Sequence, residues 1–146
     1  MSDSDLVNLY SGRILALAAD IPHLGRLPQP AATARKRSPL CGSTVTVDVV
    51  MHAGRVSAFA QDVKACALGQ AAASVLGGAA IGRNLAELTA ARAELHAMLK
   101  NHGPIPLPPF AGFEVLIPAR EYKNRHASIL LAMDAVCEAV EHAGSP

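Results

Sequence analysis

The hydrophobic pattern of this chain has the period of a β-strand in one stretch only, and that stretch limits the folds open to the chain. Val45, Val47 and Val49 alternate with polar residues, which is the period of a half-buried β-strand. After a short turn with a glycine, residues 55–63 form a candidate returning strand. Residues 31–37 are the candidate for a third strand, although no local pattern marks it. The sequence therefore predicts one hairpin, with residues 31–37 as the candidate for one further strand of the sheet.

The other periodic segments are helical. Residues 103–109 form a proline-rich linker, and residues 110–118 are expected to hold one short helical turn. The order is helix, hairpin, then helices, which is typical of an α+β fold and not of βαβ units. We expect a single domain over residues 1–146, with an N-terminal helix, a small antiparallel three-stranded sheet and C-terminal helices on one face. The predicted helices cover residues 3–20, 66–78, 84–102 and 121–142.

Composition excludes several classes of protein. Charged residues make up 17% of the chain and apolar residues 51%, so intrinsic disorder is not expected. The formal net charge is +1, with two tyrosines, three phenylalanines and no tryptophan, which argues against nucleic-acid binding. The core must therefore be built mainly from Ala, Val and Leu.

No segment predicts a membrane span or a secretory signal. The N-terminus is acidic, whereas a signal peptide begins with basic residues. The longest uncharged stretch, residues 65–82, is interrupted by four glycines and is weakly apolar for a span. Three cysteines are an odd number for a disulfide framework. We expect a cytoplasmic protein with reduced thiols.

Two of the cysteines are predicted to lie at one end of the sheet. Cys41 precedes the first strand of the hairpin, and Cys66 follows the second strand where a helix begins. A helix N-terminus stabilises a thiolate, which is also the form that binds metal. The alternative is that both are small buried hydrophobic residues, as free cysteines commonly are.

The remaining candidates are weaker on pattern alone. Cys137 lies within the last predicted helix among Val and Ala, so we expect it to pack in the core. It stands about 16 Å along that helix from His126, too far to share a mononuclear site with it. The sequence lacks a nucleophile turn of the Gly-x-Ser-x-Gly type and a phosphate-binding loop. The basic run Arg35, Lys36 and Arg37 is either a solvated loop or a docking element for an acidic partner.

Three motifs in this order resemble the U-type iron–sulfur cluster scaffold family, the group of IscU, SufU and the NifU N-terminal domain. Residues 39–42, Pro-Leu-Cys-Gly, are similar to the first cysteine motif, and residues 66–68 with 71–74 to the second. The third motif of the family is similar to residues 118–120 and 125–130. The opening segment of the family is similar to residues 9–27. The 60 residues from Cys66 to His126 are closer to the SufU branch than to the IscU branch.

Two positions depart from the family pattern. Ser43 stands where the family has an aspartate, two residues after the first cysteine. The third motif has His126 and no cysteine nearby. His126 matches either the missing cysteine or the histidine that precedes it in the IscU branch, depending on register.

The resemblance implies a metal site formed by Cys41, Cys66 and His126, with water or Ser43 in the fourth position. Two thiolates and an imidazole suit zinc, and they also suit part of a [2Fe-2S] cluster. The implied function is a non-enzymatic scaffold for cluster assembly or an accessory in sulfur transfer. Its implied partners are a cysteine desulfurase and iron–sulfur acceptor proteins.

The alternative function is a degenerate scaffold that binds zinc or a partner without assembling a cluster. A small zinc hydrolase would need a general base, and no glutamate lies in a ligand motif. We therefore do not expect an enzyme.

Overall fold

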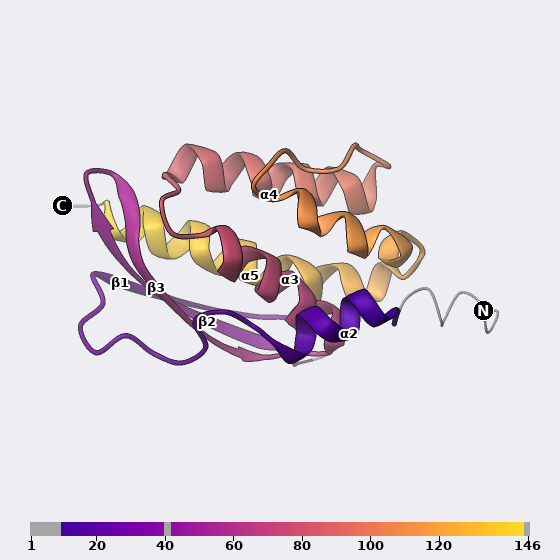
Figure 1. The fold of residues 1–146 in the computed structure, drawn as a ribbon, viewed down its shortest axis with the longest axis horizontal. Coiled ribbons are helices and arrows are strands. Elements are labelled where there is room, and N and C mark those ends of the chain that lie inside the picture. Colours follow the sequence, from indigo (N-terminus) through magenta and orange to yellow (C-terminus); the bar gives the residue numbers. More distant parts are fainter. Residues whose placement is uncertain (1–9, 40–41, 145–146) are drawn as a thin grey trace.

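The structure is a computed structural model that describes residues 10–39 and 42–144. It has the expected α+β fold, with a helix before a three-stranded sheet and helices after it (Figure 1). In chain order the elements are α2 (Gly12–Ala19), β1 (Ala32–Arg37), β2 (Thr44–His52), β3 (Arg55–Lys64), α3 (Ala67–Ala79), α4 (Leu85–Lys100), the 3₁₀ helix η1 (Ala111–Glu121) and α5 (Lys123–Ala143).

The sheet has the strand order β1-β2-β3, and both strand pairs are antiparallel. The alternation of β2 is confirmed, because its valines at 45, 47 and 49 are at most 1% exposed and face the helices. Ala53 and Gly54 turn the hairpin with positive φ angles of 52° and 78°. The candidate third strand is confirmed as β1, which pairs Arg37 with Thr44 at the end of the sheet where β3 finishes.

The helices that follow the sheet lie on one of its faces, as predicted. Figure 1 shows the sheet at the bottom, α3 and α5 above it, and α4 with η1 on the outside. Helix α5 packs against β1 and β2, while α3 packs against β3 and α5. The core consists largely of Ala, Val and Leu, and α3 contributes three consecutive fully buried alanines, residues 71–73. Small side chains allow the two central helices to approach each other closely.

The opposite face of the sheet is partly covered by the chain that joins α2 to β1. Asp48 of β2 is fully buried there and accepts hydrogen bonds from the Arg26 side chain, the Leu27 amide and the Thr33 hydroxyl. Burial by itself would raise the pKa of Asp48. The hydrogen bonds and the Arg26 charge outweigh it, so that the pKa lies below its ordinary value.

The helix ends follow local sequence signals with small shifts. Asn84 caps α4 and forms a capping box with Glu87, as its position predicts. Helix α4 ends at Lys100, two residues before the predicted end, because His102 turns the chain with a φ of 53°. Helix α2 begins at Gly12 within the predicted segment, whose first residues, 3–9, lie outside the described residues.

The prediction of one short turn after the linker was wrong. Residues 111–121 form a 3₁₀ helix of 11 residues that includes Pro118. Burial of Phe113 and Leu116 holds it in place, and the Arg120 guanidinium donates to the carbonyls of Met98 and Gly103. Long 3₁₀ helices are uncommon, and this one depends on contacts with α4 that a local pattern does not reveal. None of the helices in the described part of the chain is both long and apolar enough to cross a bilayer.

Candidate functional site

Cys66 lies at the junction that the sequence predicts, between the end of β3 and the start of α3. It is the N-cap residue of α3, with extended backbone angles, and its side chain makes no capping hydrogen bond to the helix. The thiol is half-buried and is not part of a disulfide. A thiolate at this position would meet the positive end of the α3 dipole.

Two serine hydroxyls connect Cys66 to the rest of the site. The Cys66 sulfur lies 3.4 Å from the Ser128 hydroxyl oxygen, and Ser128 donates a hydrogen bond of 3.2 Å to the Ser43 hydroxyl. Ser43 and Ser128 are 6% and 1% exposed. This chain of three polar groups, the Cys66–Ser128–Ser43 cluster, joins the starts of α3, α5 and β2.

Gly69 makes the close approach of α3 and α5 possible. A Cβ atom on Gly69 would lie 2.8 Å from the Ser128 hydroxyl oxygen and 3.1 Å from the Ser128 carbonyl oxygen. The first distance is shorter than real Cβ contacts and the second is tighter than most of them, so a larger residue would push α5 away from the first turn of α3. Glycine at this position therefore sets the distance between Cys66 and Ser128.

Cys41 lies outside the described residues, so the expected position of this cysteine is not tested. The chain on either side of it is described. The Ser38 amide donates to the Ser43 carbonyl, and the Gly42 amide donates to the Ser38 carbonyl, at 2.8 and 2.9 Å. Because Thr44 pairs with Lys64, residues 42–43 lie at the end of the sheet where Cys66 begins α3.

His126 is buried, with 1% of its surface exposed. Its Nε2 lies 3.0 and 3.1 Å from the carbonyl oxygens of Ala119 and Arg120, so Nε2 carries the proton and donates it there. Its Nδ1 atom is buried and has no hydrogen-bond partner in the part of the chain that the structure describes. Burial lowers the pKa of His126, and the nearby charges of Lys100 and Lys123 lower it further, which favours the neutral imidazole.

The structure does not bring His126 into hydrogen-bond contact with Cys66. His126 precedes Ser128 by two residues on α5, which is a rotation of about 200° around the helix. The Ser128 side chain points to Cys66, while the His126 ring reaches the end of η1. Among residues 10–39 and 42–144, no group of three or more His, Cys, Asp or Glu side chains could hold a metal ion. The predicted ligand set includes Cys41 and stays a prediction.

The tautomer of the His126 imidazole nevertheless suits a metal ligand. A ligating histidine commonly donates its second N–H to a backbone carbonyl, which fixes the tautomer and leaves the other nitrogen free. His126 has this arrangement, with Nδ1 as the free nitrogen. The residues present therefore fit a soft metal such as zinc or iron in donor chemistry.

The sequence interpretation missed Ser128 as a member of the site. It lies within the third motif, but a serine two residues after a histidine carries no signal of its own. Cys137 is 3% exposed in the core, as predicted, and burial raises the pKa of its thiol. Four of the other histidines, at positions 52, 96, 102 and 142, are exposed as expected.

Comparison with solved structures places the chain among proteins of one fold. A candidate iron–sulfur cluster assembly scaffold protein for the SUF system, from Fervidobacterium islandicum, matches with a TM-score of 0.81 and 18% identity, over 92% of this chain and 98% of that one. A hypothetical protein matches with a TM-score of 0.82 and 21% identity, over 92% and 98%. At these identities both likenesses establish the fold alone.

The N-terminal part of a nitrogen-fixing NifU-like protein from Brucella abortus is much more similar. It has 45% identity and a TM-score of 0.92, and the match covers 95% of this chain and 96% of that one. Protein-family models give no match to the chain. A search of curated proteins gives none either. Identity at this level over nearly the whole length is decisive, and the chain belongs to the NifU-like N-terminal family, the U-type group that its three motifs resemble.

Proposed function

We propose that this protein is a scaffold for iron–sulfur cluster assembly or a sulfur-transfer accessory. The observation that carries the proposal is the Cys66–Ser128–Ser43 cluster. It places a half-buried thiol at a helix N-terminus, beside the loop between β1 and β2 that contains Cys41 in sequence. The NifU-like relative and the SUF-type neighbour support it through the functions in their names. The iron–sulfur cluster is then cargo, which the protein holds and passes on.

In the proposed site, Cys41, Cys66 and His126 bind the metal. His126 would use Nδ1, since its Nε2–H donates to the end of η1. Ser43, which replaces the family aspartate, is neutral, and there is no third thiolate from the third motif. The site therefore carries less negative charge than the family pattern, and we expect it to retain a [2Fe-2S] cluster less tightly.

Sulfur would arrive by transfer from a cysteine desulfurase. The thiolate of Cys66 or Cys41 attacks the outer sulfur of a persulfide on the donor, and the donor S–S bond breaks. The donor cysteine leaves as a thiolate, and the accepting cysteine becomes the persulfide. When Cys66 is a thiolate, the Ser128 hydroxyl would turn its one proton from Ser43 to the sulfur and donate a hydrogen bond to it before the attack. This chemistry needs reduced thiols, as in the cytoplasm, and ends with transfer of the cluster to an acceptor protein.

The second candidate function is a zinc-binding or partner-binding module of the same fold. Ser43 in place of the aspartate and the absence of a cysteine from the third motif favour it. Two thiolates and one imidazole are a common part of a tetrahedral zinc site. In that case zinc would occupy the site and no cluster would form.

One experiment tests both candidates. The protein is purified without oxygen, its zinc and iron are measured, and it is treated with ferrous iron, cysteine and a cysteine desulfurase. Visible absorption of a cluster supports the scaffold. Stoichiometric zinc that prevents cluster formation supports the module.

Variants locate the site. We expect Cys41→Ala and Cys66→Ala to lose the bound metal, because each removes a thiolate ligand. Cys137→Ala is the matched control, since this third cysteine is buried in the core, and it should keep the metal. If Cys41→Ala and Cys66→Ala both retain full metal content, the proposed site is wrong.

A further inference from the structure

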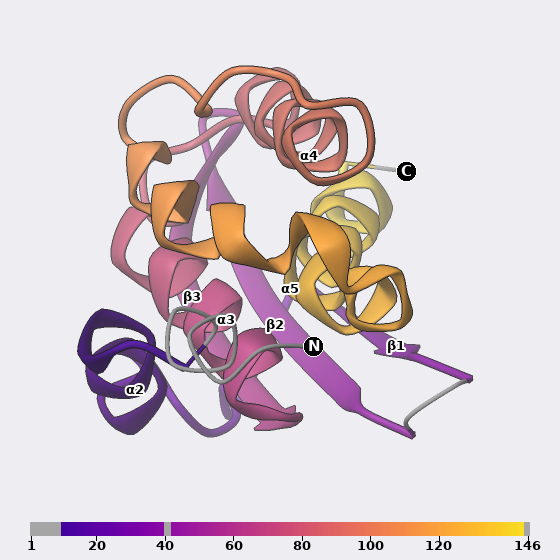
Figure 2. The ribbon, with the colours of Figure 1, turned by 90° about the vertical axis from the view of Figure 1, so that its right-hand side faces the viewer.

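A groove with a basic rim runs along α5. Strand β1 forms one side of it and helix α4 the other, and Figure 2 shows the three elements one below another on its right-hand side. The cavity in this groove has a volume of about 440 Å³. Its rim carries Lys36 and Arg37 from β1, Lys100 from α4 and Lys123 from α5. We call it the α5 groove.

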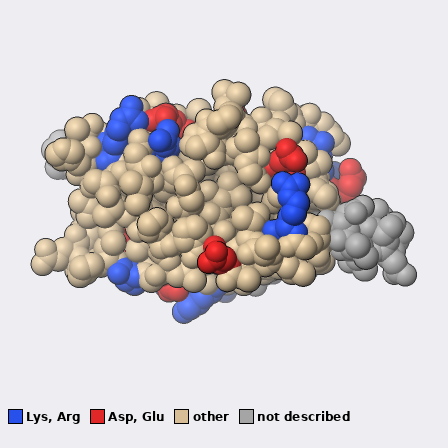
Figure 3. Space-filling model, viewed as in Figure 1, with Lys and Arg blue, Asp and Glu red and all other residues tan. Residues whose placement is uncertain are grey.

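Within the described residues, three of the four basic side chains on this rim lack an ion pair, and the cavity is also lined by Asp134, whose carboxylate pairs with Arg92. Lys36 forms an ion pair with Glu138 at 3.3 Å. No ion pair joins Arg37, Lys100 or Lys123 to a carboxylate within residues 10–39 and 42–144. The face in Figure 3, by contrast, carries only scattered charged side chains.

The floor of the groove is apolar. Ala127, Leu130 and Leu131 of α5 line it, and the exposed ring of Pro39 lies at one end. An apolar floor between basic walls suits a polypeptide segment with an apolar anchor and acidic neighbours better than it suits a small hydrated anion.

The basic surface continues beyond this cavity. A second cavity of about 450 Å³ shares Lys100 and Lys123 with the first and adds Arg120 and His102, together with one acid, Glu121. Both cavities are therefore parts of one mainly basic surface around the N-terminus of α5.

A buried polar group lies on the wall of the groove. Ser38 is 1% exposed and lines the cavity, and its hydroxyl oxygen makes no hydrogen bond to any residue of ranges 10–39 and 42–144. Unpaired buried hydroxyls are uncommon in native proteins, and a polar group of a docked partner would satisfy this one. Ser38 is also close in sequence to Cys41, and the Arg37 guanidinium lies near Gly42.

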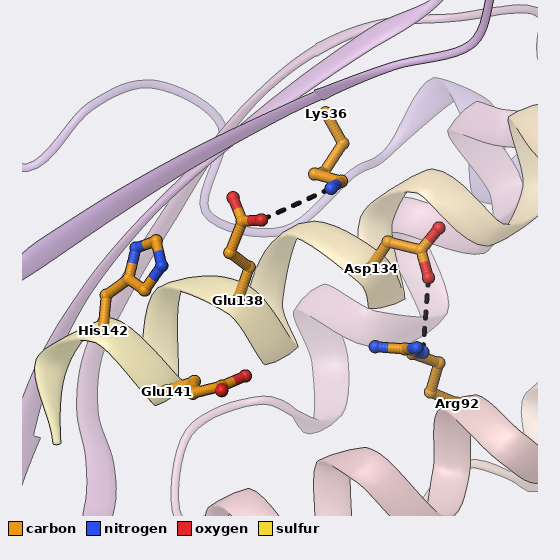
Figure 4. Close-up of a pocket in the computed structure, with 6 residues that line it drawn as sticks. All are labelled: Lys36, Arg92, Asp134, Glu138, Glu141 and His142. Atoms are coloured by element: carbon orange, nitrogen blue, oxygen red, sulfur yellow. Dashed lines mark hydrogen bonds and ion pairs between the residues drawn. The ribbon is translucent and has the colours of Figure 1, made fainter. Parts of the chain in front are cut away.

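Acidic side chains follow further along α5. Figure 4 shows Asp134, Glu138 and Glu141 there, with Glu138 reaching Lys36 and Asp134 reaching Arg92. These ion pairs neutralise Glu138 and Asp134, whereas Lys123 has no ion-pair partner among the described residues. A segment bound along α5 would therefore place its acidic part near Lys123, at the end of α5 next to the site.

We propose that the α5 groove is the docking surface for an acidic, partly apolar segment of the protein that supplies sulfur. This inference rests on the proposed function and specifies where its partner binds. Apolar side chains of that segment pack on the floor, and its carboxylates pair with Arg37, Lys100 and Lys123. Docking there brings the donor beside the loop that connects β1 to β2.

The test measures binding of the cysteine desulfurase from the same organism by titration calorimetry. The variant Lys100→Glu/Lys123→Glu reverses two exposed rim charges. It should weaken binding by about tenfold or more, and its binding should depend less on salt. The control Arg13→Glu/Arg35→Glu has the same net charge, with both changes outside the groove, and should bind within about twofold of the unchanged protein.

Three results would overturn the proposal: no binding of the unchanged protein, equal binding by the two double variants, or displacement of the desulfurase by inorganic phosphate but not by chloride at the same ionic strength. The last would indicate a free oxyanion site.

Reconstitution with iron and sulfide alone, without desulfurase, tests the metal site separately. The groove variant should then still acquire the cluster, whereas failure of the unchanged protein to acquire it would contradict the proposed function and not the docking surface.

Discussion

The thiol sulfur of Cys66 lies 3.4 Å from the hydroxyl oxygen of Ser128, although 62 residues separate them in the chain. The contact joins the N-cap of α3 to the second turn of α5. It is the point where the fold places polar groups around a cysteine that is neither buried in the core nor part of a disulfide. Several expectations depend on it.

Gly69→Ala should destabilise the protein and separate α3 from α5. The new methyl group would lie 2.8 Å from the Ser128 hydroxyl oxygen and 2.9 Å from the Ala65 side chain. We expect a loss of about 1–3 kcal/mol in the free energy of unfolding, measured by urea denaturation. Gly78→Ala on the same helix is the control. Nothing lies within 4 Å of its added methyl, so it should be neutral or stabilise by up to about 1 kcal/mol. Equal effects of the two changes would contradict the close packing at Gly69.

Ser128→Ala should slow the reaction of Cys66 with iodoacetamide. Ser128 donates to Ser43 while Cys66 is a thiol, and on ionisation of Cys66 the same hydroxyl would turn to the thiolate, so its loss removes a hydrogen bond to the charged form. We expect the second-order rate at neutral pH to fall by about three- to tenfold. The measurement uses mass spectrometry of the Cys66 peptide. Ser74→Ala on α3, whose hydroxyl bonds to the Asp20 carbonyl, is the control and should leave the rate unchanged.

Asp48→Asn should cost stability near neutral pH and less in acid. The pKa of Asp48 is lowered in the folded protein, so its carboxylate contributes stability above the unfolded pKa of about 4. That contribution is lost as the pH falls through the folded value. We expect the variant to be less stable by about 1–3 kcal/mol at neutral pH, because the carboxylate accepts four hydrogen bonds from Arg26, Leu27 and Thr33. Thermal unfolding across pH should show the difference narrowing below about pH 4. A constant difference would refute the role of the charge.

His126→Gln should flatten the dependence of stability on pH. The folded protein lowers the pKa of His126, so below about pH 6.5 the unfolded chain binds a proton that the folded one resists. Stability is therefore highest above that pH and falls as the pH decreases towards the folded value. Denaturant unfolding at a series of pH values should show a smaller decrease in the variant than in the unchanged protein. A parallel decrease in both would mean that another group is responsible.

Much of this fold follows from local signals. The valine alternation of β2, the glycine turn after it and the Asn84 cap each require only neighbouring residues, and the structure confirms all three. The position of Cys66 at the end of a strand and the start of a helix follows in the same way. The length of η1 did not, since tertiary contacts of Phe113 and Arg120 hold a 3₁₀ helix that has no strong local signal.

Which residues form the site depends on which face of each helix turns toward Cys66, and the position of the helices in the sequence does not decide it. Sequence placed His126 and Ser128 together on one helix, and only packing decided which of them meets Cys66. The groove along α5 likewise needed β1 and α4, whose basic residues lie more than 60 positions apart in the chain. Short-range periodicity determines where a helix or a strand forms, because its interactions span only a few residues. Which side chains converge depends on how those elements pack, and that is decided by contacts between residues far apart in sequence.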